Sequence, residues 1–275
     1  MRAAIFTILA LAACSFVTFL CMSATKAGCS DCLILPDMSL YSFSAMKLPY
    51  PSPPEPAEWR KMPAATRLLD LDTRLKPLLL KELSAAGFRL GSPIFLRGFK
   101  ESRELELWIQ VKSGWKLFRT YPIAAASGKL GPKLQEGDGQ VPEGCYFVTA
   151  PQMNPASNYH LALNIGYPNA YDREHLRTGS LIMIHGSNVS IGCLAMTDAV
   201  IEEVYLIAAA AQADGQSHIP VHLYPFQMTP ERMSAAVGDE SENFWRELLP
   251  IYESFEKRHV PPSYVVQNGR YELKR

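Results

Sequence analysis

The chain has 275 residues, 48% of them hydrophobic and 20% charged, and its 27 basic residues equal its 27 acidic residues in number. This length and composition suit one sizeable folded domain with extensions or two small domains, and they exclude a disordered chain and a membrane protein with many spans. The charge is balanced and no basic stretch carries interleaved aromatic residues, so nucleic acid is not an expected partner.

Residues 1–27 have the layout of an export signal. Arg2 precedes an apolar run from Ile5 to Met22, and small residues follow as far as Ala27. This order predicts a secretory signal peptide that is cleaved after Ala27. Two alternatives stay open, because the run is nearly long enough to remain as a membrane anchor, and Leu-Ala-Ala-Cys14 resembles a lipoprotein cleavage box. Each of them predicts export to the periplasm or cell envelope, with membrane contact only through this N-terminal segment.

The segment from residue 28 to residue 65 contains a proline cluster between Pro49 and Pro56, which predicts an extended linker that lets a folded domain reach away from the membrane. Cys29 and Cys32 lie near its start, and they either pair in an oxidising compartment or remain an unpaired couple in a flexible segment. No second pair of ligands stands at the spacing of a zinc finger, so neither a metal nor a cofactor is expected.

Residues 66–90 predict a helical segment, because leucines recur at helical spacing up to Gly87, with an interruption at Pro77. The region 91–226 then changes to short segments that are rich in β-branched and aromatic residues and are separated by turn residues. In one of these segments apolar and polar positions alternate, which is the pattern of a half-buried strand. The predicted strands are 93–99, 104–111, 115–123, 145–150, 180–185 and 219–226.

A glycine-rich stretch from Ser127 to Gly144 separates the third and fourth of these strands. It lacks the Gly-Lys-Ser/Thr ending of a phosphate-binding loop, so we interpret it as a long turn. A helix is expected to begin at Thr197 or Asp198, since either is a good N-cap. Residues 227–275 predict a C-terminal helical extension, with a helix over 242–258 that Pro250 breaks or kinks and a short final strand near Tyr264. These elements together predict an α+β fold, mainly β, with flanking helices.

The segment from Ile182 to Asp198 carries residues suited to cysteine acyl chemistry. His185 ends a predicted strand, and Cys193 follows it by eight residues, just before the predicted helix. A loop of that length can bring the imidazole to the thiol as its base, and a helix N-terminus would lower the thiol pKa. Gly192 would let backbone N–H groups face a developing oxyanion. The alternative is an inert buried cysteine and a histidine that is only hydrogen-bonded.

The same segment resembles the active-site signature of YkuD-type L,D-transpeptidases, in which a His-Gly pair precedes a Ser-His-Gly-Cys box. Here the pair is His185-Gly186, and the box is Ser-Ile-Gly-Cys from Ser190 to Cys193, followed by Ala-Met-Thr as in the YafK-like branch. Other motifs of that branch occur between Leu90 and Phe226. They are S-G-x-x-G-P-K from Ser127, P-E-G from Pro142, N-I-G-Y-P-N from Asn164 and R-T-G from Arg177.

The resemblance implies a β-sandwich-like catalytic domain in which Cys193 is the acylated nucleophile and His185 is the general base. It also implies that the carbonyl group of Gly186 orients the histidine, and that Ser190 and Gly192 shape the oxyanion loop. The substrates would be peptidoglycan stem peptides that carry diaminopimelate. The enzyme would attack them at an L,D-peptide bond and pass the acyl group to an amine or to water.

Two positions depart from the family pattern. Ile191 replaces the box histidine, and Ala195 replaces an arginine found in many relatives. Because two polar groups are lost, we expect a changed hold on the substrate carboxylate and on the acceptor. The leading hypothesis is an exported cysteine acyl-transfer enzyme that acts on stem peptides. The alternatives are a hydrolase of the same fold, which cleaves an L,D-peptide bond or the link between peptidoglycan and a lipoprotein, and a non-catalytic wall-binding protein.

Five further residues have an expected place. Arg177, Asn164 and Tyr167 are candidates for the substrate groove, and loop packing is the alternative for each of them. Lys133 is expected to be a solvated lysine rather than a ligand of a substrate carboxylate. Cys145, at the start of a predicted strand, is expected to be a small buried apolar residue.

Overall fold

The computed structural model describes residues 46–274. The predicted export signal, Cys14, Cys29 and Cys32, and the first part of the predicted linker lie outside the described residues. Among the helices that are described, none has the length and apolar character needed to cross a membrane.

A five-stranded sheet with the order β3-β2-β1-β10-β5 forms one layer of the fold. Neighbouring strands are antiparallel except for β1 and β10, which are parallel. The predicted alternation in β2 is confirmed, because Leu105, Leu107 and Ile109 are buried and the residues between them are only partly buried. The strands are β1 (Ile94–Phe99), β2 (Glu104–Val111), β3 (Gly114–Pro122), β5 (Gly144–Val148) and β10 (Ile219–Tyr224).

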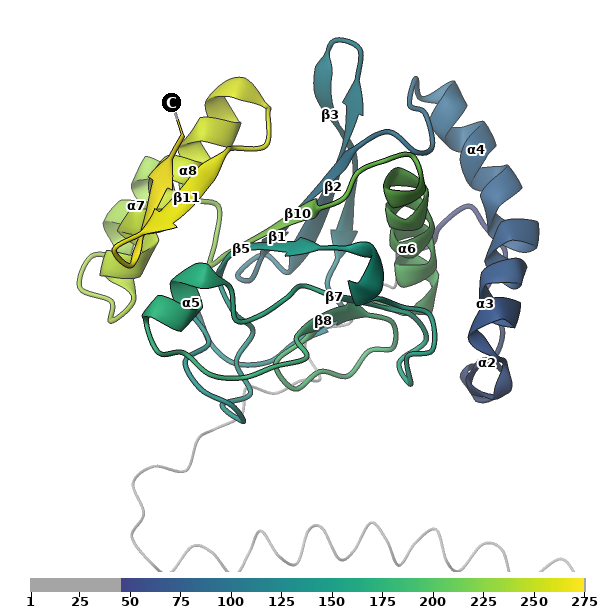
Figure 1. The fold of residues 1–275 in the computed structure, drawn as a ribbon, viewed down its shortest axis with the longest axis horizontal. Helices are drawn as coiled ribbons and strands as arrows, with labels where there is room; N and C mark the ends of the chain where they lie inside the picture. The colour runs from purple at the N-terminus through teal and green to yellow at the C-terminus, as the bar shows by residue number, and fades with distance from the viewer. Residues whose placement is uncertain (1–45, 275) are drawn as a thin grey trace, which may run out of the picture. The chain divides into compact units, whose positions relative to one another are not determined.

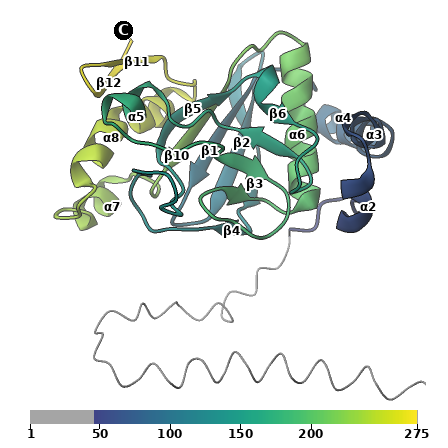
Figure 2. The same cartoon turned by 60° about the horizontal axis from the view of Figure 1, so that its bottom comes forward.

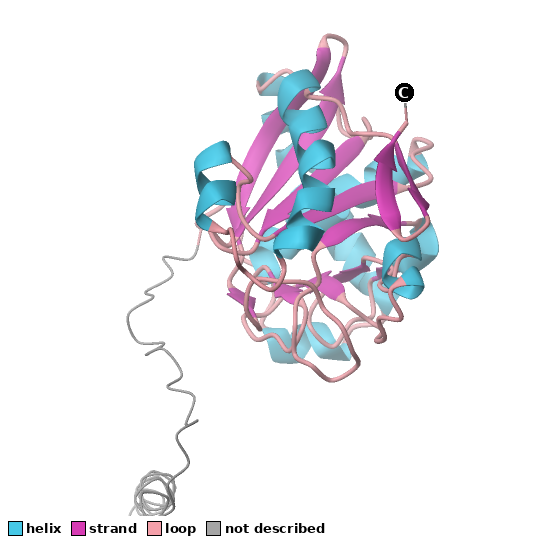
Figure 3. Cartoon of the chain, turned by 90° about the vertical axis from the view of Figure 1, so that its left-hand side faces the viewer, coloured by secondary structure: helices cyan, strands magenta, loops and turns pink. Residues whose placement is uncertain are grey.

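A second sheet of five short strands has the order β4-β9-β8-β7-β6. It lies in front of the larger sheet in Figure 2, and its strands lie among long loops in Figure 3. The strand predicted over 180–185 is shorter than expected, since Leu181 has a φ of 56° and cannot continue an extended chain. The strands are β4 (Ala125–Ala126), β6 (Met153–Asn154), β7 (Ala162–Asn164), β8 (Met183–His185) and β9 (Leu194–Ala195).

Helices cover both sides of the larger sheet, as Figure 1 shows. On one side lie α3 (Ala64–Asp70), a π-helical turn (Leu71–Leu75), α4 (Lys76–Ala85) and α6 (Asp198–Ala213). On the other side lie α7 (Pro230–Ala235), α8 (Glu242–Arg258) and the hairpin of β11 (Tyr264–Gln267) and β12 (Arg270–Leu273). Two shorter helices are α2 (Pro56–Lys61) and α5 (Ala170–Glu174). The helix predicted over 242–258 is confirmed at both ends, and Pro250, where a break or a kink was expected, lies inside one continuous helix.

A buried arginine fastens the C-terminal extension to the larger sheet. Arg97 of β1 is 2% exposed, and its guanidinium forms ion pairs with Glu106 at 3.0 Å and with Glu256 of α8 at 2.6 Å. The same guanidinium lies over the rings of Phe255 and Tyr252, 4.4 and 5.2 Å from their centroids. The described residues belong to one compact unit, in which the predicted segments 66–90 and 91–226 and the described part of 227–275 are joined.

The proline-rich segment differs from the predicted extended linker over the part that is described. Trp59 of α2 is fully buried, its ring stacks on His160 with 3.9 Å between centroids, and its Nε1 donates to the carbonyl oxygen of His160 at 3.0 Å. Leu48 is also buried. Residues 46–65 therefore pack on the domain. The prediction failed there because proline content says nothing about apolar side chains that find a partner surface far along the chain.

Candidate active site

The smaller sheet places His185 and Cys193 on one face. Strands β8 and β9 run parallel, with Ile184 opposite Leu194 and His185 opposite Ala195. Ile184 and Leu194 point into the core. Because alternate residues of a strand point to opposite faces, His185 and Ala195 lie on the other face. Cys193 directly precedes β9 and falls on the same side as Ala195 by this alternation.

The backbone holds the ring of His185 in one orientation. Nδ1 lies 2.6 Å from the carbonyl oxygen of Gly186. Since a carbonyl oxygen only accepts hydrogen bonds, Nδ1 carries the proton and Nε2 is left as a proton acceptor. Gly186 is needed in this turn, because a Cβ there would lie 2.6 Å from Asp198 Oδ1 and 2.7 Å from Cβ of His160. The ring of Tyr159 packs against His185 with 4.9 Å between centroids.

Cys193 is the accessible thiol of the described part of the chain. It is partly exposed, whereas Cys145 is 2% exposed, as expected for a buried apolar residue. The thiol of Cys193 donates a weak hydrogen bond to the carbonyl oxygen of Leu181 at 3.7 Å. Among the described residues, no hydrogen bond joins Sγ to His185. The thiol must therefore turn from Leu181 toward the imidazole before a proton can pass between them.

The protonation of the two groups is set mainly by their burial. Burial raises the pKa of the Cys193 thiol, although the charge of Lys133 acts in the opposite sense. Burial lowers the pKa of the His185 imidazole, although the charge of Asp198 opposes this. Both shifts favour a neutral thiol and a neutral imidazole at rest. The thiol pKa is thus raised, not lowered as predicted, and α6 begins only at Asp198, beyond β9.

Two serine hydroxyls engage the backbone amides next to the nucleophile. The N–H of Cys193 donates to Ser190 Oγ at 3.0 Å, and that hydroxyl donates to the carbonyl oxygen of Cys193 at 2.5 Å. The N–H of Gly192 donates to Ser127 Oγ at 2.5 Å. Gly192 has a φ of +87°, which favours glycine. These amides were expected to be free for an oxyanion. Both are instead occupied, so a hydroxyl has to turn away before either amide can bind one.

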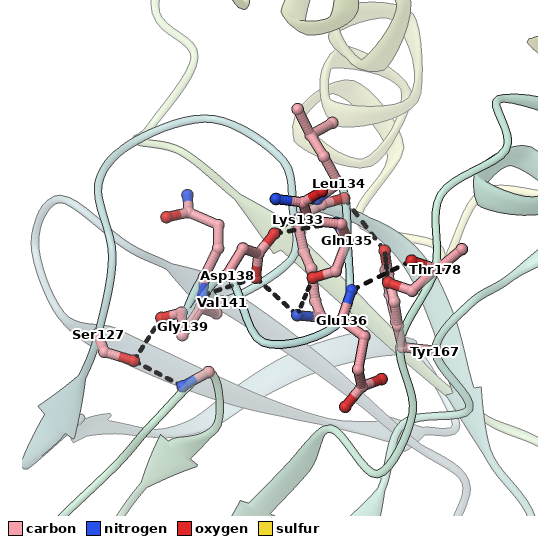
Figure 4. A network of polar contacts seen from close by, with 12 residues as sticks. Ser127, Lys133, Leu134, Gln135, Glu136, Asp138, Gly139, Val141, Tyr167 and Thr178 are labelled. Carbon is pink, nitrogen blue, oxygen red and sulfur yellow. Dashed lines mark hydrogen bonds and ion pairs between the residues drawn. The ribbon is translucent and has the colours of Figure 1, made fainter.

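Ser127 joins this segment to the glycine-rich loop, residues 127–144, as Figure 4 shows. Its hydroxyl donates to the carbonyl oxygen of Gly139 at 2.6 Å, inside the same loop. Lys133 is 4% exposed and its Nζ donates to Asp138 Oδ1 at 2.6 Å. The expectation of a solvated lysine was therefore wrong, because the loop folds back and encloses the side chain with a carboxylate partner.

Glu143 fastens the far end of the glycine-rich loop. Its side chain is fully buried, and Oε1 accepts the N–H of Gly131 at 2.7 Å while Oε2 accepts Nε1 of Trp245 at 2.7 Å. Lys100 forms an ion pair with the same carboxylate at 3.0 Å. The loop is thus held at both ends and across its middle, so it presents a preformed wall to Cys193 rather than a free turn.

Comparison with known proteins decides the family. Residues 102–221 match the family model YkuD, the L,D-transpeptidase catalytic domain. Two curated relatives named "Putative L,D-transpeptidase YafK", from Escherichia coli strain K12 and from O157:H7, are each 43% identical over 182 residues, which is 66% of this chain and 74% of the relative. The chain belongs to the YkuD family of L,D-transpeptidase catalytic domains.

Two solved structures are similar to this chain at low identity. The helical cell shape determining protein Pgp2 from Campylobacter jejuni has a TM-score of 0.39 and 18% identity, over 68% of this chain and 80% of that chain. L,D-transpeptidase 1 from Mycobacterium tuberculosis has a TM-score of 0.27 and 14% identity, over 50% of this chain and 64% of that chain.

Membership of the YkuD family confirms the predicted resemblance and the predicted fold, α+β and mainly β with flanking helices. The matched range contains the segment from His185 to Cys193 and the whole glycine-rich loop. Helices α2, α3 and α4 lie before it, and α7 and α8 lie after it.

The three candidates for the substrate groove have different surroundings. Asn164 lies on β7 opposite Met183, so by strand alternation it shares the face of His185, and its Oδ1 accepts the N–H of Gly166 at 2.9 Å. Tyr167 is 5% exposed and its hydroxyl donates to the carbonyl oxygen of Lys133 at 3.1 Å. Asn164 stays a candidate, whereas the side chain of Tyr167 is engaged in holding the glycine-rich loop.

The third candidate, Arg177, also has a structural partner. It is 9% exposed, and its guanidinium pairs with Asp172 at 2.8 Å and lies over the ring of Phe244, 4.6 Å from the centroid. It lines a groove of about 770 Å³ between the glycine-rich loop and α8. The structure therefore ties Arg177 to the packing of the C-terminal extension.

Sequence reasoning missed two residues of the site. Ser127 begins a family motif, so its position carried a signal, but its bond to Gly192 spans 65 residues and has no local signature. Tyr159 carried no signal at all, because only the fold brings its ring to His185. Across the described residues there is no group of three or more His, Cys, Asp and Glu side chains placed to hold a metal ion.

Proposed function

We propose that this protein is an exported cysteine acyl-transfer enzyme that acts on peptidoglycan stem peptides through an acyl-enzyme on Cys193. Membership of the L,D-transpeptidase family supports a cell-wall enzyme. The observation that carries the finer proposal is the hydrogen bond from His185 Nδ1 to the Gly186 carbonyl oxygen, which leaves Nε2 as a base on the face where Cys193 lies.

The reaction proceeds in two halves. In the first, the Cys193 thiol gives its proton to Nε2 of His185, and the thiolate attacks the carbonyl carbon of an L,D-peptide bond. The C–N bond breaks, the imidazolium returns the proton to the leaving amine, and a thioester remains on Sγ. In the second half, an amine or a water molecule loses a proton to Nε2 and attacks the thioester. The Sγ–C bond breaks and the thiol is restored by that proton.

The residues around the nucleophile help to set the barrier of the first half. Because burial raises the thiol pKa and lowers the imidazole pKa, forming the ion pair costs free energy until the substrate brings a partner for the charge. Lys133 supplies a positive field that favours the thiolate. Turning the hydroxyl of Ser127 or Ser190 away would release an amide for the oxyanion of the tetrahedral intermediate.

Hydrolysis is the second candidate outcome, and one observation favours it. Ile191, at the position of the family's box histidine, is 87% exposed beside Cys193 and offers no hydrogen bond to orient an acceptor amine. Ala195 is fully buried and carries no charge. With the acceptor poorly held, water can resolve the thioester, which would release a stem peptide or a peptidoglycan-linked lipoprotein.

Two measurements test these proposals. The full chain is first incubated with a carbapenem, and the acylated residue is mapped by mass spectrometry. We expect an adduct that Cys193→Ala abolishes and Cys145→Ala retains, since Cys145 is buried and burial raises its thiol pKa. An adduct on Cys145, or none in the wild type, would overturn the nucleophile assignment. Purified sacculi treated with wild type and with Cys193→Ala then show new cross-links for transfer, or released peptide or lipoprotein for hydrolysis.

Export is a separate part of the proposal and rests on residues 1–27. Mass spectrometry of the protein from the envelope fraction of a bacterial host reads its N-terminus. A start at Gly28 supports a cleaved signal, an intact Met1 in the membrane supports an anchor, and a lipidated Cys14 supports a lipoprotein. Recovery of the intact chain in the cytosol alone would contradict export.

A further inference from the structure

A cavity of about 360 Å³ lies beside the turn that follows His185, and none of the predicted site residues line it. Its walls include Trp59 and Arg60 of α2, Tyr159 and His160 before β7, and Asn188 and Asp198 from the segment around Cys193. Its size is that of a site for a small ligand or for one residue of a peptide. The part of this wall that α2 contributes lies before the residues that match the YkuD model.

The wall that α2 contributes is fixed in place. Trp59 stacks on the ring of His160 at 3.9 Å between centroids and donates to its carbonyl oxygen at 3.0 Å. The carbonyl oxygen of His160 also accepts Nη1 of Arg67 at 3.2 Å, and His160 Nε2 lies 2.8 Å from Oε1 of the buried Glu202. The backbone of this wall is therefore preformed, and a ligand has to order only the exposed side chains at the opening.

The cavity lies next to the proposed general base. Tyr159 is half exposed and lines the cavity, and its ring packs against His185 with 4.9 Å between centroids. Asn188 lines the cavity too and belongs to the segment between His185 and Cys193. A group held in the cavity would therefore lie against Tyr159 and next to the segment that leads to Cys193.

The side chains around the opening have the chemistry of a carboxylate site. Among the described residues, the exposed guanidinium of Arg60 has no ion pair, and no hydrogen bond is formed by the side-chain amides of Asn158 and Asn188. A guanidinium with amide donors beside it binds a carboxylate through several parallel hydrogen bonds. Asp198 also lines the cavity, but its carboxylate is engaged by the chain itself. Its Oδ1 accepts the N–H of Ser187 at 2.6 Å, and its Oδ2 lies 3.7 Å from Nδ1 of His160.

We propose that this cavity is a subsite for a peptide carboxylate, held by Arg60 with Asn158 and Asn188. The subsite would hold one part of the substrate beside the segment that carries His185 and Cys193. The proposal rests on the proposed function only for the identity of the ligand, a stem peptide with free carboxylates. It adds a recognition element that comes from α2 rather than from the segment around Cys193.

The test pairs a protein change with a ligand change. The full chain carrying Cys193→Ala, which prevents turnover, is titrated by calorimetry with a synthetic stem tetrapeptide that contains diaminopimelate, and with the same peptide whose carboxylates are carboxamides. Arg60→Gln should weaken binding of the free acid about tenfold, which equals about 1.4 kcal/mol, and should leave binding of the carboxamide unchanged. The matched control is Lys61→Gln, the same loss of charge on the next residue of α2, which pairs with Glu58 and does not line the cavity.

The subsite is refuted if Lys61→Gln weakens the free acid as much as Arg60→Gln does, or if Arg60→Gln weakens the acid and the carboxamide equally. Should Arg60→Gln fail to fold, the comparison is made with the Cys193→Ala chain that keeps Arg60. In that protein the free acid must bind more tightly than the carboxamide. The result is independent of the acylation assay. Carbapenem acylation without any Arg60 effect removes the subsite alone, whereas Arg60-dependent binding without acylation removes the enzymatic function alone.

Discussion

Removing the hydroxyl of Ser127 should slow acyl transfer at Cys193, and it should leave the pKa of the thiol and its rate of alkylation unchanged. This hydroxyl accepts the N–H of Gly192 at 2.5 Å and donates to the carbonyl oxygen of Gly139 at 2.6 Å. Ser127→Ala leaves a buried amide without its acceptor and unfastens the nucleophile segment from the glycine-rich loop. Two lost hydrogen bonds of about 1 kcal/mol each lower the free energy of unfolding by roughly 1–2 kcal/mol. The freed Gly192 amide by itself favours an oxyanion, but the same change loosens the segment that positions both amides, and we expect this poorer placement to outweigh the gain and to slow acylation about tenfold.

The assay compares two reactions of the same thiol. Acylation by a carbapenem builds an oxyanion and needs a fixed backbone, whereas alkylation by iodoacetamide needs only an accessible thiolate. Both rates are followed by intact-protein mass spectrometry across pH for the wild type and for Ser127→Ala. The ratio of acylation to alkylation should fall about tenfold in the variant, which corresponds to about 1.4 kcal/mol of barrier. The pH at which alkylation reaches half its maximum should stay the same.

A second variant separates this effect from general loosening of the loop. Thr178 Oγ1 accepts the N–H of Glu136 at 3.1 Å, so Thr178→Val breaks a bond of the same loop without touching Gly192. It should leave the ratio within about twofold of the wild type, while Ser127→Thr, which keeps a hydroxyl, should restore most of it. An unchanged or increased ratio in Ser127→Ala, or an equal fall in Thr178→Val, would refute the reasoning.

Three further predictions follow from charge and burial. Asp198→Asn removes the charge that opposes the lowering of the His185 pKa, so the acidic limb of the acylation profile should move to lower pH; a limb that stays in place or moves up would contradict this. Trp59→Ala should lower the free energy of unfolding by about 3–5 kcal/mol in denaturant titrations, because it removes a fully buried ring; a loss below about 1 kcal/mol would show that α2 is not anchored by this side chain. Burial lowers the pKa of His222 to about 3 in the folded protein, whereas in the unfolded chain the imidazole has its ordinary pKa of about 6.5. Between these two values only the unfolded chain takes up a proton at His222, so the free energy of unfolding falls as the pH drops below about 6.5. Between pH 7 and pH 5 the loss should be about 2 kcal/mol greater in the wild type than in His222→Gln, and an equal loss in both would exclude His222 as its source.

Local patterns in the sequence were enough to predict most elements of the fold. The alternation in β2 and the length of α8 depend on the spacing of neighbouring residues, which a strand or a helix converts directly into faces. The orientation of His185 by Gly186 also involves adjacent residues, and it matches what the family resemblance implied. Local patterns did less well where one residue's backbone decided the outcome, as at Leu181, whose positive φ shortens β8.

The environment of the site depended on contacts between distant parts of the chain. Trp59 meets His160 across 101 residues, and Ser127 meets Gly192 across 65, so neither contact has a local signature. The burial of Lys133 likewise required the glycine-rich loop to fold back on its own carboxylate. The sequence by itself determined the nucleophile candidate, its base and the family. Only the tertiary structure decided that the thiol is neutral at rest, that its neighbouring amides are occupied and that α2 closes a cavity beside the base. Burial and hydrogen bonding act on free energy through space, whereas sequence patterns record only neighbours along the chain.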